Sequence, residues 1–177
     1  MSEEPELLPV EQLEATNPQL LTNRITEHFF FRVIGESRPI STLTIVTPWI
    51  SKWESGPVSL TKLRGAIDSR RIRTVVLTRP PDEPWHADAL DQLAESRLVS
   101  IYLIPNLHAK IFICDAIPMG FGLVGSANLT AQALRNFEVG ILFEGRGILS
   151  HLLKELRILA QDLRRIAVSR YPRPRGG

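Results

Sequence analysis

Two short segments near the middle of the chain constrain its fold and its chemistry more than any other part of the sequence. The first is His108-Ala-Lys-Ile-Phe-Ile-Cys-Asp115, and the second is Gly125-Ser-Ala-Asn128. Residues two apart on a strand share a face. On an expected strand from His108 to Cys114, the side chains of His108 and Lys110 therefore point the same way, and Asp115 points to the other face.

The second segment is expected to bring a hydroxyl and an amide to the same place. Gly125 lets the backbone turn and come close to a ligand. Ser126 and Asn128 then stand at the mouth of a short helix expected from about Leu129, where free N–H groups suit a phosphate. Asn128 could serve as a helix N-cap as well as a ligand.

The imidazole, ammonium, hydroxyl and amide groups of these two segments fit phosphoryl transfer without a metal. A neutral imidazole at His108 can attack phosphorus and form a covalent phosphohistidine, while Lys110 and Asn128 stabilise the added negative charge. The four histidines are scattered along the chain, and no carboxylate pair accompanies His108 at ligand spacing. We therefore expect no metal and no other cofactor.

The pattern His108-x-Lys110-x4-Asp115 with Gly125-Ser126-x-Asn128 resembles the signature of the phospholipase D superfamily, and its wording resembles the small, nuclease-like branch. The resemblance covers roughly residues 40–165. It implies that His108 is the nucleophile, that Lys110 and Asn128 bind phosphate with help from Ser126, and that Asp115 is largely structural. The spacing between Asp115 and Gly125 is a few residues longer than usual, which predicts a longer hairpin over 116–120.

The resemblance also implies a role for Glu138, at a position where such proteins often carry a carboxylate that orients the histidine. An acceptor for Nδ1–H would leave Nε2 free to attack. Glu138 interrupts an apolar strand, where an idle charge would be costly. The alternative is an ordinary charge on an edge strand.

The rest of the pattern predicts one α/β domain, a mixed sheet flanked by helices. We expect a loose acidic arm over 1–20, a phospholipase D-like phosphodiesterase domain over 21–168 and a basic tail over 169–177. Strands are expected over 41–50, 73–78, 100–104, 108–114, 121–124 and 138–143. Helices are expected from Pro57, over 86–97 and over 148–165, the last with leucines 149, 152, 153, 156, 159 and 163 in register.

Composition narrows the setting. The longest apolar runs are far too short to cross a bilayer, and the chain opens with acidic residues rather than a secretory leader. A single cysteine, Cys114, favours a reducing cytoplasm, although it could be a small buried hydrophobe in any compartment. Arg164, Arg165 and Arg170 are candidates for binding substrate phosphates, or they only keep the end of the last helix soluble.

Three functions remain open at this stage. The favoured one is a nuclease that cleaves DNA, or else RNA, as a homodimer whose two His108 side chains face one phosphate. The dimer is expected because this chain holds one HxK only, and a twofold axis supplies the second histidine. The alternatives are a lipid phosphodiesterase and a nuclease or phosphate-binding subunit of a defence or restriction complex with an ATPase partner. We expect no membrane partner.

Overall fold

The computed structural model describes residues 17–172, and one mixed sheet organises them. Its eight strands lie in the order β1-β9-β8-β7-β2-β5-β6-β10. Strands β2, β5 and β6 run parallel, and all other neighbours are antiparallel. The strands are β1 (Gln19–Leu21), β2 (Ile40–Val46), β5 (Arg73–Thr78), β6 (Val99–Leu103), β7 (Ile111–Ala116), β8 (Phe121–Gly125), β9 (Gly140–Glu144) and β10 (Ser169–Arg170). A small separate hairpin joins β3 (Glu54–Ser55) to β4 (Val58–Ser59).

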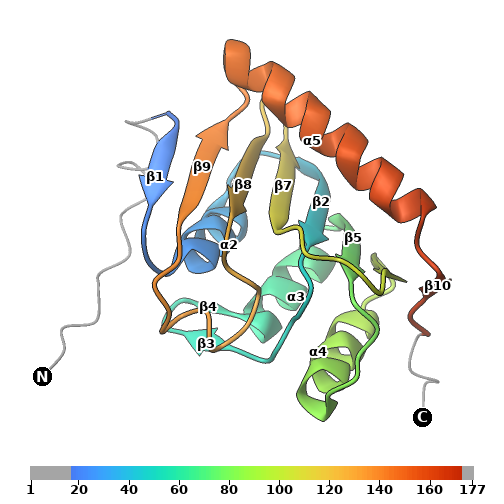
Figure 1. Cartoon of the computed structure of the whole chain (residues 1–177). Helices are drawn as coiled ribbons and strands as arrows, with labels where there is room; N and C mark the ends of the chain where they lie inside the picture. Colours follow the sequence, from blue (N-terminus) through green and yellow to red (C-terminus); the bar gives the residue numbers. More distant parts are fainter. Residues whose placement is uncertain (1–16, 173–177) are drawn as a thin grey trace, which may run out of the picture.

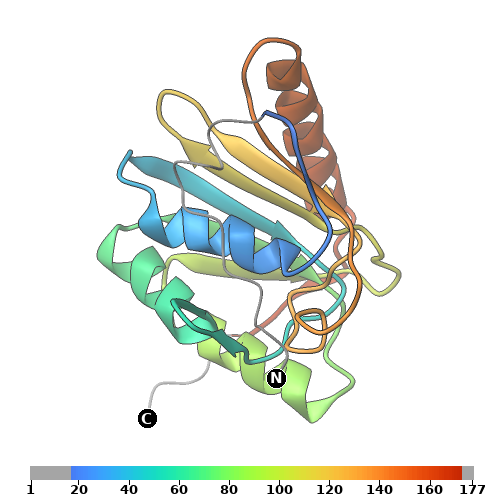
Figure 2. The same cartoon turned by 90° about the vertical axis from the view of Figure 1, so that its left-hand side faces the viewer.

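Helices cover both faces of the sheet unequally. Three of them, α2 (Ile25–Gly35), α3 (Leu60–Ser69) and α4 (Pro84–Ala94), lie side by side on one face (Figure 2). A single long helix, α5 (Ile148–Arg165), crosses the other face diagonally and leaves β1, most of β9 and part of β8 uncovered (Figure 1). The prediction of a mixed sheet flanked by helices is confirmed.

The core has two parts because the sheet is buried from both sides. The larger part, under α2–α4, contains an aromatic cluster of Phe29, Phe30, Trp53, Phe112 and Phe121. The smaller part lies under α5. Side chains from β7 alternate between the two, since Phe112 and Cys114 face α2 while Ile111 and Ile113 face α5.

Several expected elements differ from those observed. The expected strand from His108 begins only at Ile111, so His108 and Lys110 precede it. The expected short helix from Leu129 is wrong: residues 131–135 form turns. Helix α2 was not predicted at all. In α5, Leu153 and Leu156 are buried as expected, but Leu152 and Leu159 are 40% and 44% exposed.

The predicted arm over 1–20 falls mainly on residues 1–16, which lie outside the described residues, but Gln19 and Leu20 belong to β1. Likewise Ser169 and Arg170 of the predicted tail form β10, whereas 173–177 lie outside the described residues. Cys114 is fully buried, and burial raises its pKa to about 12, so it serves as a core residue. Within residues 17–172 no helix is long and apolar enough to cross a membrane.

Candidate active site

The candidate residues gather at one end of the sheet because neighbouring strands alternate in direction around β7. Strands β2, β5 and β8 end there, whereas β7 and β9 begin there. His108 and Lys110 stand before β7, Ser126 and Asn128 follow β8, and Glu138 precedes β9. Five polar groups from three chain segments are thus brought to a single edge.

His108 is exposed, and its ring nitrogen contacts an arginine. The Nη2 of Arg79 lies 2.6 Å from Nε2 of His108, and Nε of Arg79 donates to the carbonyl of Leu107 at 2.8 Å. A guanidinium has donors only, so Nε2 accepts this bond with its lone pair, and the ring proton is on Nδ1.

Lys110 lies next to His108 and between charges of both signs. Its Nζ donates to the carbonyl oxygen of His108 at 2.8 Å. Burial lowers the pKa of Lys110, and the Arg79 guanidinium lowers it further, while the Glu138 carboxylate acts in the opposite direction. The site therefore holds two cations and one carboxylate around the imidazole.

Ser126 and Glu138 are joined directly. The Ser126 hydroxyl donates to a carboxylate oxygen of Glu138, and its oxygen accepts from the backbone N–H of Val139 at 3.0 Å. The N–H of Ser126 in turn donates to the carbonyl of Val139 at 2.9 Å. Within residues 17–172 Glu138 bonds to Ser126 and forms no hydrogen bond to the His108 of the same chain. The role of Glu138 in orienting His108 therefore stays a prediction.

Asn128 stands on a loop that is fixed to the end of β2 and not to a helix. The N–H of Leu129 donates to the hydroxyl of Thr47 at 3.3 Å, and the N–H of Ser51 donates to the carbonyl of Leu129 at 3.0 Å. The Asn128 Oδ1 atom is buried without a hydrogen-bond partner in the described residues. The expected phosphate site at a helix N-terminus is therefore replaced by a clamped loop.

Gly125 is required by packing inside the protein. A Cβ atom there would lie 2.5 Å from the carbonyl oxygen of Val139, 2.8 Å from Cδ1 of Ile25 and 2.9 Å from Cα of Gly140. The glycine thus lets β8 and β9 approach each other over the start of α2, immediately before Ser126.

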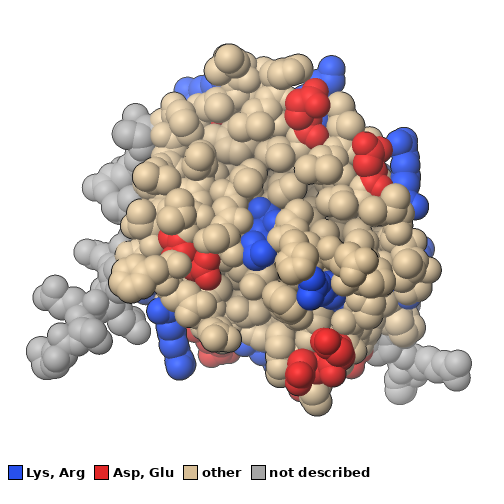
Figure 3. All heavy atoms as spheres, viewed as in Figure 1, with Lys and Arg blue, Asp and Glu red and all other residues tan. Residues whose placement is uncertain are grey.

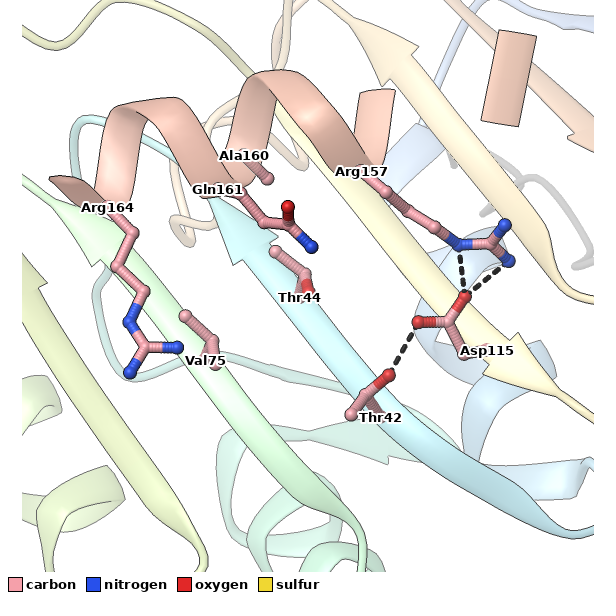
Figure 4. A pocket seen from close by; sticks show the side chains of 8 residues that line it. All are labelled: Thr42, Thr44, Val75, Asp115, Arg157, Ala160, Gln161 and Arg164. Atoms are coloured by element: carbon pink, nitrogen blue, oxygen red, sulfur yellow. Dashed lines mark hydrogen bonds and ion pairs between the residues drawn. The ribbon is translucent and has the colours of Figure 1, made fainter. Parts of the chain in front are cut away.

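Asp115 lies at the far end of β7, where it holds α5 on the sheet. Both Nε and Nη2 of Arg157 contact its Oδ1, at 2.7 and 2.5 Å, and Thr42 donates to its Oδ2 at 2.5 Å (Figure 4). A pocket of about 200 Å³ opens beside this group and extends to Arg164. It contains no histidine, and these contacts suit the structural role expected for Asp115.

The structure does not bring the three predicted substrate-binding arginines against His108. Arg164 and Arg170 lie over the ring of Tyr102, 4.6 and 5.2 Å from its centroid, near the β6 edge of the sheet. Arg170 also bonds to Ser100, and Arg165 pairs with Asp162. Strands β2 and β5 separate them from β7.

Sequence reasoning missed Arg79. It directly follows the strand β5 and precedes two prolines, so it was interpreted only as the end of a strand. The available signal was its position: β5 runs parallel to β2, and a residue just past its end joins the same edge as the loop after β2.

An apolar row continues the sheet surface beside the site. Leu20, Ile141 and Val124 are direct neighbours across β1, β9 and β8, and they are 65%, 46% and 36% exposed. Val139 and Phe137, next to Glu138, are also exposed, at 56% and 102%. Figure 3 shows few charged side chains over this part of the face and Lys and Arg atoms near its centre. We call Leu20, Val124, Phe137, Val139 and Ile141 the apolar patch.

Solved structures, but no family model and no curated sequence, are similar to this chain. No protein-family model matches this sequence, and no curated protein matches it significantly. Among solved structures, the chain is similar to the phospholipase D family member Nuc from Salmonella typhimurium, with a TM-score of 0.65 and 17% identity over 89% of this chain and 99% of that one.

Two further structures agree with this. NucT from Helicobacter pylori matches with a TM-score of 0.63 and 14% identity, over 86% of this chain and 98% of NucT. Polyphosphate kinase from Porphyromonas gingivalis matches with a TM-score of 0.59 and 14% identity, over 89% of this chain but only 30% of the kinase. The TM-scores above 0.6 and the nearly complete coverage of Nuc and NucT show that this chain has the fold of these two proteins.

Proposed function

We propose that this protein is a phosphodiesterase that cleaves nucleic acid, with DNA favoured, through a covalent intermediate on His108. The observation that carries the proposal is the edge of the sheet where His108, Lys110, Ser126, Asn128 and Glu138 meet. A nucleophile, a cation and two neutral polar groups at one end of the sheet are the groups that the attack on a phosphodiester requires. The similarity to Nuc and NucT supports the same reaction class.

The proposed reaction needs one group that donates a proton in the first step and accepts one in the second. The Nε2 lone pair of His108 forms an N–P bond, the P–O bond to the leaving group breaks, and the departing oxygen takes a proton from a general acid. Water then attacks phosphorus and gives its proton to the group that acted as general acid in the first step, the N–P bond breaks, and the electron pair returns to Nε2. Lys110 and Asn128 stabilise the negative charge on phosphate oxygens in both steps. We propose that no metal takes part, since Lys110 and Arg79 would repel one.

A homodimer supplies the general acid in this proposal. No hydrogen bond among residues 17–172 joins His108 to a second histidine, since His86 is fully buried against Thr78, and the apolar patch borders Ser126 and Glu138. A twofold contact through the apolar patch would remove it from water and place the two active-site edges opposite each other. The His108 of one chain then attacks while that of its partner donates the proton.

Arg164, Arg165 and Arg170 extend the proposal to the nucleic-acid backbone. They stand exposed around Tyr102 at the β6 edge, and no carboxylate pairs with Arg164 or Arg170 in residues 17–172. If they bind phosphates, replacing all three by alanine should weaken DNA binding and flatten the slope of log K against log salt by about two to three units. An unchanged slope in a filter-binding titration would identify them as a solvated surface.

One observation favours a second function, hydrolysis of a lipid phosphodiester. The apolar patch lies beside the site, as an enzyme working at a lipid surface would require. Few charged side chains lie over it (Figure 3), which suits a protein partner better than a membrane with charged headgroups. An ATPase partner that supplies specificity remains a further proposal, and the apolar patch is not needed for it.

The test compares substrates directly. Purified protein is incubated in excess EDTA with labelled plasmid, single-stranded DNA, RNA and phosphatidylcholine vesicles. We expect cleavage of DNA without added metal, and none by His108→Ala, whose fold is checked by circular dichroism. Lys110→Ala should cost roughly 2–4 kcal/mol of transition-state stabilisation.

A divalent-ion requirement would exclude the covalent-histidine mechanism. Cleavage of the vesicles alone would replace the nuclease by a lipid phosphodiesterase. Glu155→Gln, on the outer side of α5, is the control that should keep full activity.

A further inference from the structure

Arg79 is held in place from several directions at the edge that carries the candidate nucleophile. Its backbone N–H donates to the carbonyl of Pro48 at 3.2 Å, and its Nε donates to the carbonyl of Leu107 at 2.8 Å. Its guanidinium lies over the ring of Trp49, 4.7 Å from the centroid. A side chain fixed by its stem, its Nε and its flat face presents the remaining nitrogens in a defined direction.

One of these nitrogens points at the reactive atom of His108. The Nη2 of Arg79 is 2.6 Å from Nε2 of His108. Because the guanidinium only donates, the contact is possible only while Nε2 carries its lone pair and the ring proton stays on Nδ1. The same lone pair has to form the bond to phosphorus. Arg79 and the substrate therefore compete for one position.

The competition has a simple outcome when a phosphate enters. Guanidinium groups bind phosphate oxygens through parallel N–H donors, more strongly than they bind a neutral imidazole nitrogen. Arg79 forms no ion pair with a carboxylate among residues 17–172, so its charge is available. Its influence on Lys110 places the two cations close to each other. An incoming phosphate oxygen would take over Nη2 and release Nε2.

We propose that Arg79 is a second phosphate-binding cation of this site, which holds His108 in its nucleophilic tautomer until a phosphate oxygen displaces it. The proposal rests on the function proposed above, because it assumes that His108 attacks a phosphodiester. Trp49 is a positioning residue in it, since it contacts Arg79 and not the substrate.

Kinetics provide the first test. We expect Arg79→Ala to lower kcat/KM for DNA about 10²–10³-fold, the scale for losing one preorganised donor. Arg79→Lys, which keeps the charge but not the fork, should recover only part of this. Added guanidinium ion should restore activity to Arg79→Ala in proportion to its concentration, and it should not restore His108→Ala.

Arg73→Ala is the matched control, because Arg73 is an exposed arginine on the same strand at its other end. It should keep wild-type kcat/KM. Wild-type kcat/KM in Arg79→Ala would overturn the proposal. So would an activity loss that Arg79→Lys does not relieve and guanidinium does not rescue, since that pattern describes a structural role.

Imidazole ¹⁵N NMR provides the second test and needs no turnover. In the free protein at pH 8, we expect His108 to carry its proton on Nδ1, with Nε2 unprotonated. Adding inorganic phosphate should shift the Nε2 signal in wild type but not in Arg79→Gln. A proton on Nε2 in the free protein, or an equal phosphate response in both proteins, would overturn the proposal. An inactive wild type that still gives the expected NMR response would remove the proposed function and leave the arginine–phosphate contact standing.

Discussion

Lys110 shows how the charges at the edge of the sheet control one another. Burial lowers its pKa, the Arg79 guanidinium lowers it further, and the Glu138 carboxylate opposes both. Glu138 is itself held by the hydroxyl of Ser126. In the mechanism proposed above, Lys110 acts as a cation, so any change in this balance changes the pH range in which the site can work.

The first prediction concerns that range. Lys110 is active when protonated, and its lowered pKa means that the proton is lost at a lower pH than from an ordinary lysine. The alkaline limb of kcat/KM should therefore fall below the usual lysine range. Glu138→Gln removes an attraction and should move this limb to still lower pH, whereas Arg79→Gln removes a repulsion and should move it to higher pH.

The measurement is kcat/KM between pH 6 and 11 for wild type and both variants. Shifts of opposite sign would support the balance of charges described here. Shifts of the same sign, or none in either variant, would show that another group controls the alkaline limb.

Among the secondary-structure elements, α2 is the helix that buries charged and titratable side chains in the core. It buries Glu27, His28 and Arg32, which are 1%, 5% and 2% exposed. Arg32 pairs with Glu144 of β9, and its guanidinium lies 4.2 Å from the centroid of Phe121. This pair joins the helix to the strand that follows Glu138. The position of β9 beside β8, and hence the active-site edge, depends on it.

The second prediction tests this pair by removing one partner. Glu144→Gln leaves the Arg32 cation buried without its counter-charge and should lower the free energy of unfolding by about 3–5 kcal/mol. Replacing both, as Arg32→Met with Glu144→Gln, should cost less because neither charge of this pair remains. Urea denaturation measures both. Glu155→Gln on α5 should have almost no effect, and an equally small effect of Glu144→Gln would contradict the prediction.

The sequence predicted best those elements in which the pattern of apolar residues matches the side chains that are buried. Strand β5 and helix α5 begin and end at the expected residues, 73–78 and 148–165. Helix α2 was missed because its charged residues are buried, so its apolar pattern is broken. The helix expected from Leu129 is absent because the N–H of Ser51, far earlier in the chain, binds the Leu129 carbonyl oxygen, which would otherwise accept the first helical hydrogen bond.

The candidate site was predicted in its members but not in its contacts. His108, Lys110 and Ser126 were identified from their spacing, and Glu138 from the family resemblance and from its place in an apolar strand. The spacing of residues along the sequence does not predict the order of the strands in the sheet. The position of Arg79 beside His108 follows from the parallel pairing of β2 and β5, which was not predicted from the sequence.

At the scale of the whole molecule, a single row of side chains runs across the sheet from β1 to β10. Its members are direct neighbours in successive strands, and α5 covers only the right-hand part of the sheet in Figure 1. In the middle of the row Ile111, Val46 and Leu77 are apolar and buried, whereas Leu20, Ile141 and Val124 of the apolar patch are exposed. The row is Leu20, Ile141, Val124, Ile111, Val46, Leu77, Tyr102 and Arg170.

The third prediction is that the apolar patch is the dimer contact and that both chains serve one phosphate. Ile141→Glu should give a monomer in sedimentation velocity and abolish cleavage. Ile158→Glu is the control, because Ile158 is similarly exposed, at 41%, but lies on α5. A monomeric wild type would contradict this directly.

Mixing chains tests the shared site further. Wild-type protein with excess His108→Ala should form heterodimers with almost no activity, because one of the two imidazoles is missing. Heterodimers that retain half of the wild-type activity would show that each His108 acts independently.

Both borders of the large sheet are made by very short strands. Strand β1 has three residues and β10 has two, while the strands between them have five to seven. A short border strand offers a neighbouring molecule few unpaired backbone groups, which is how natural sheets limit runaway strand addition. Growth of fibrils from either side of this sheet is therefore disfavoured. Any specific self-association has to be made face to face by side chains, and such contacts close after two copies.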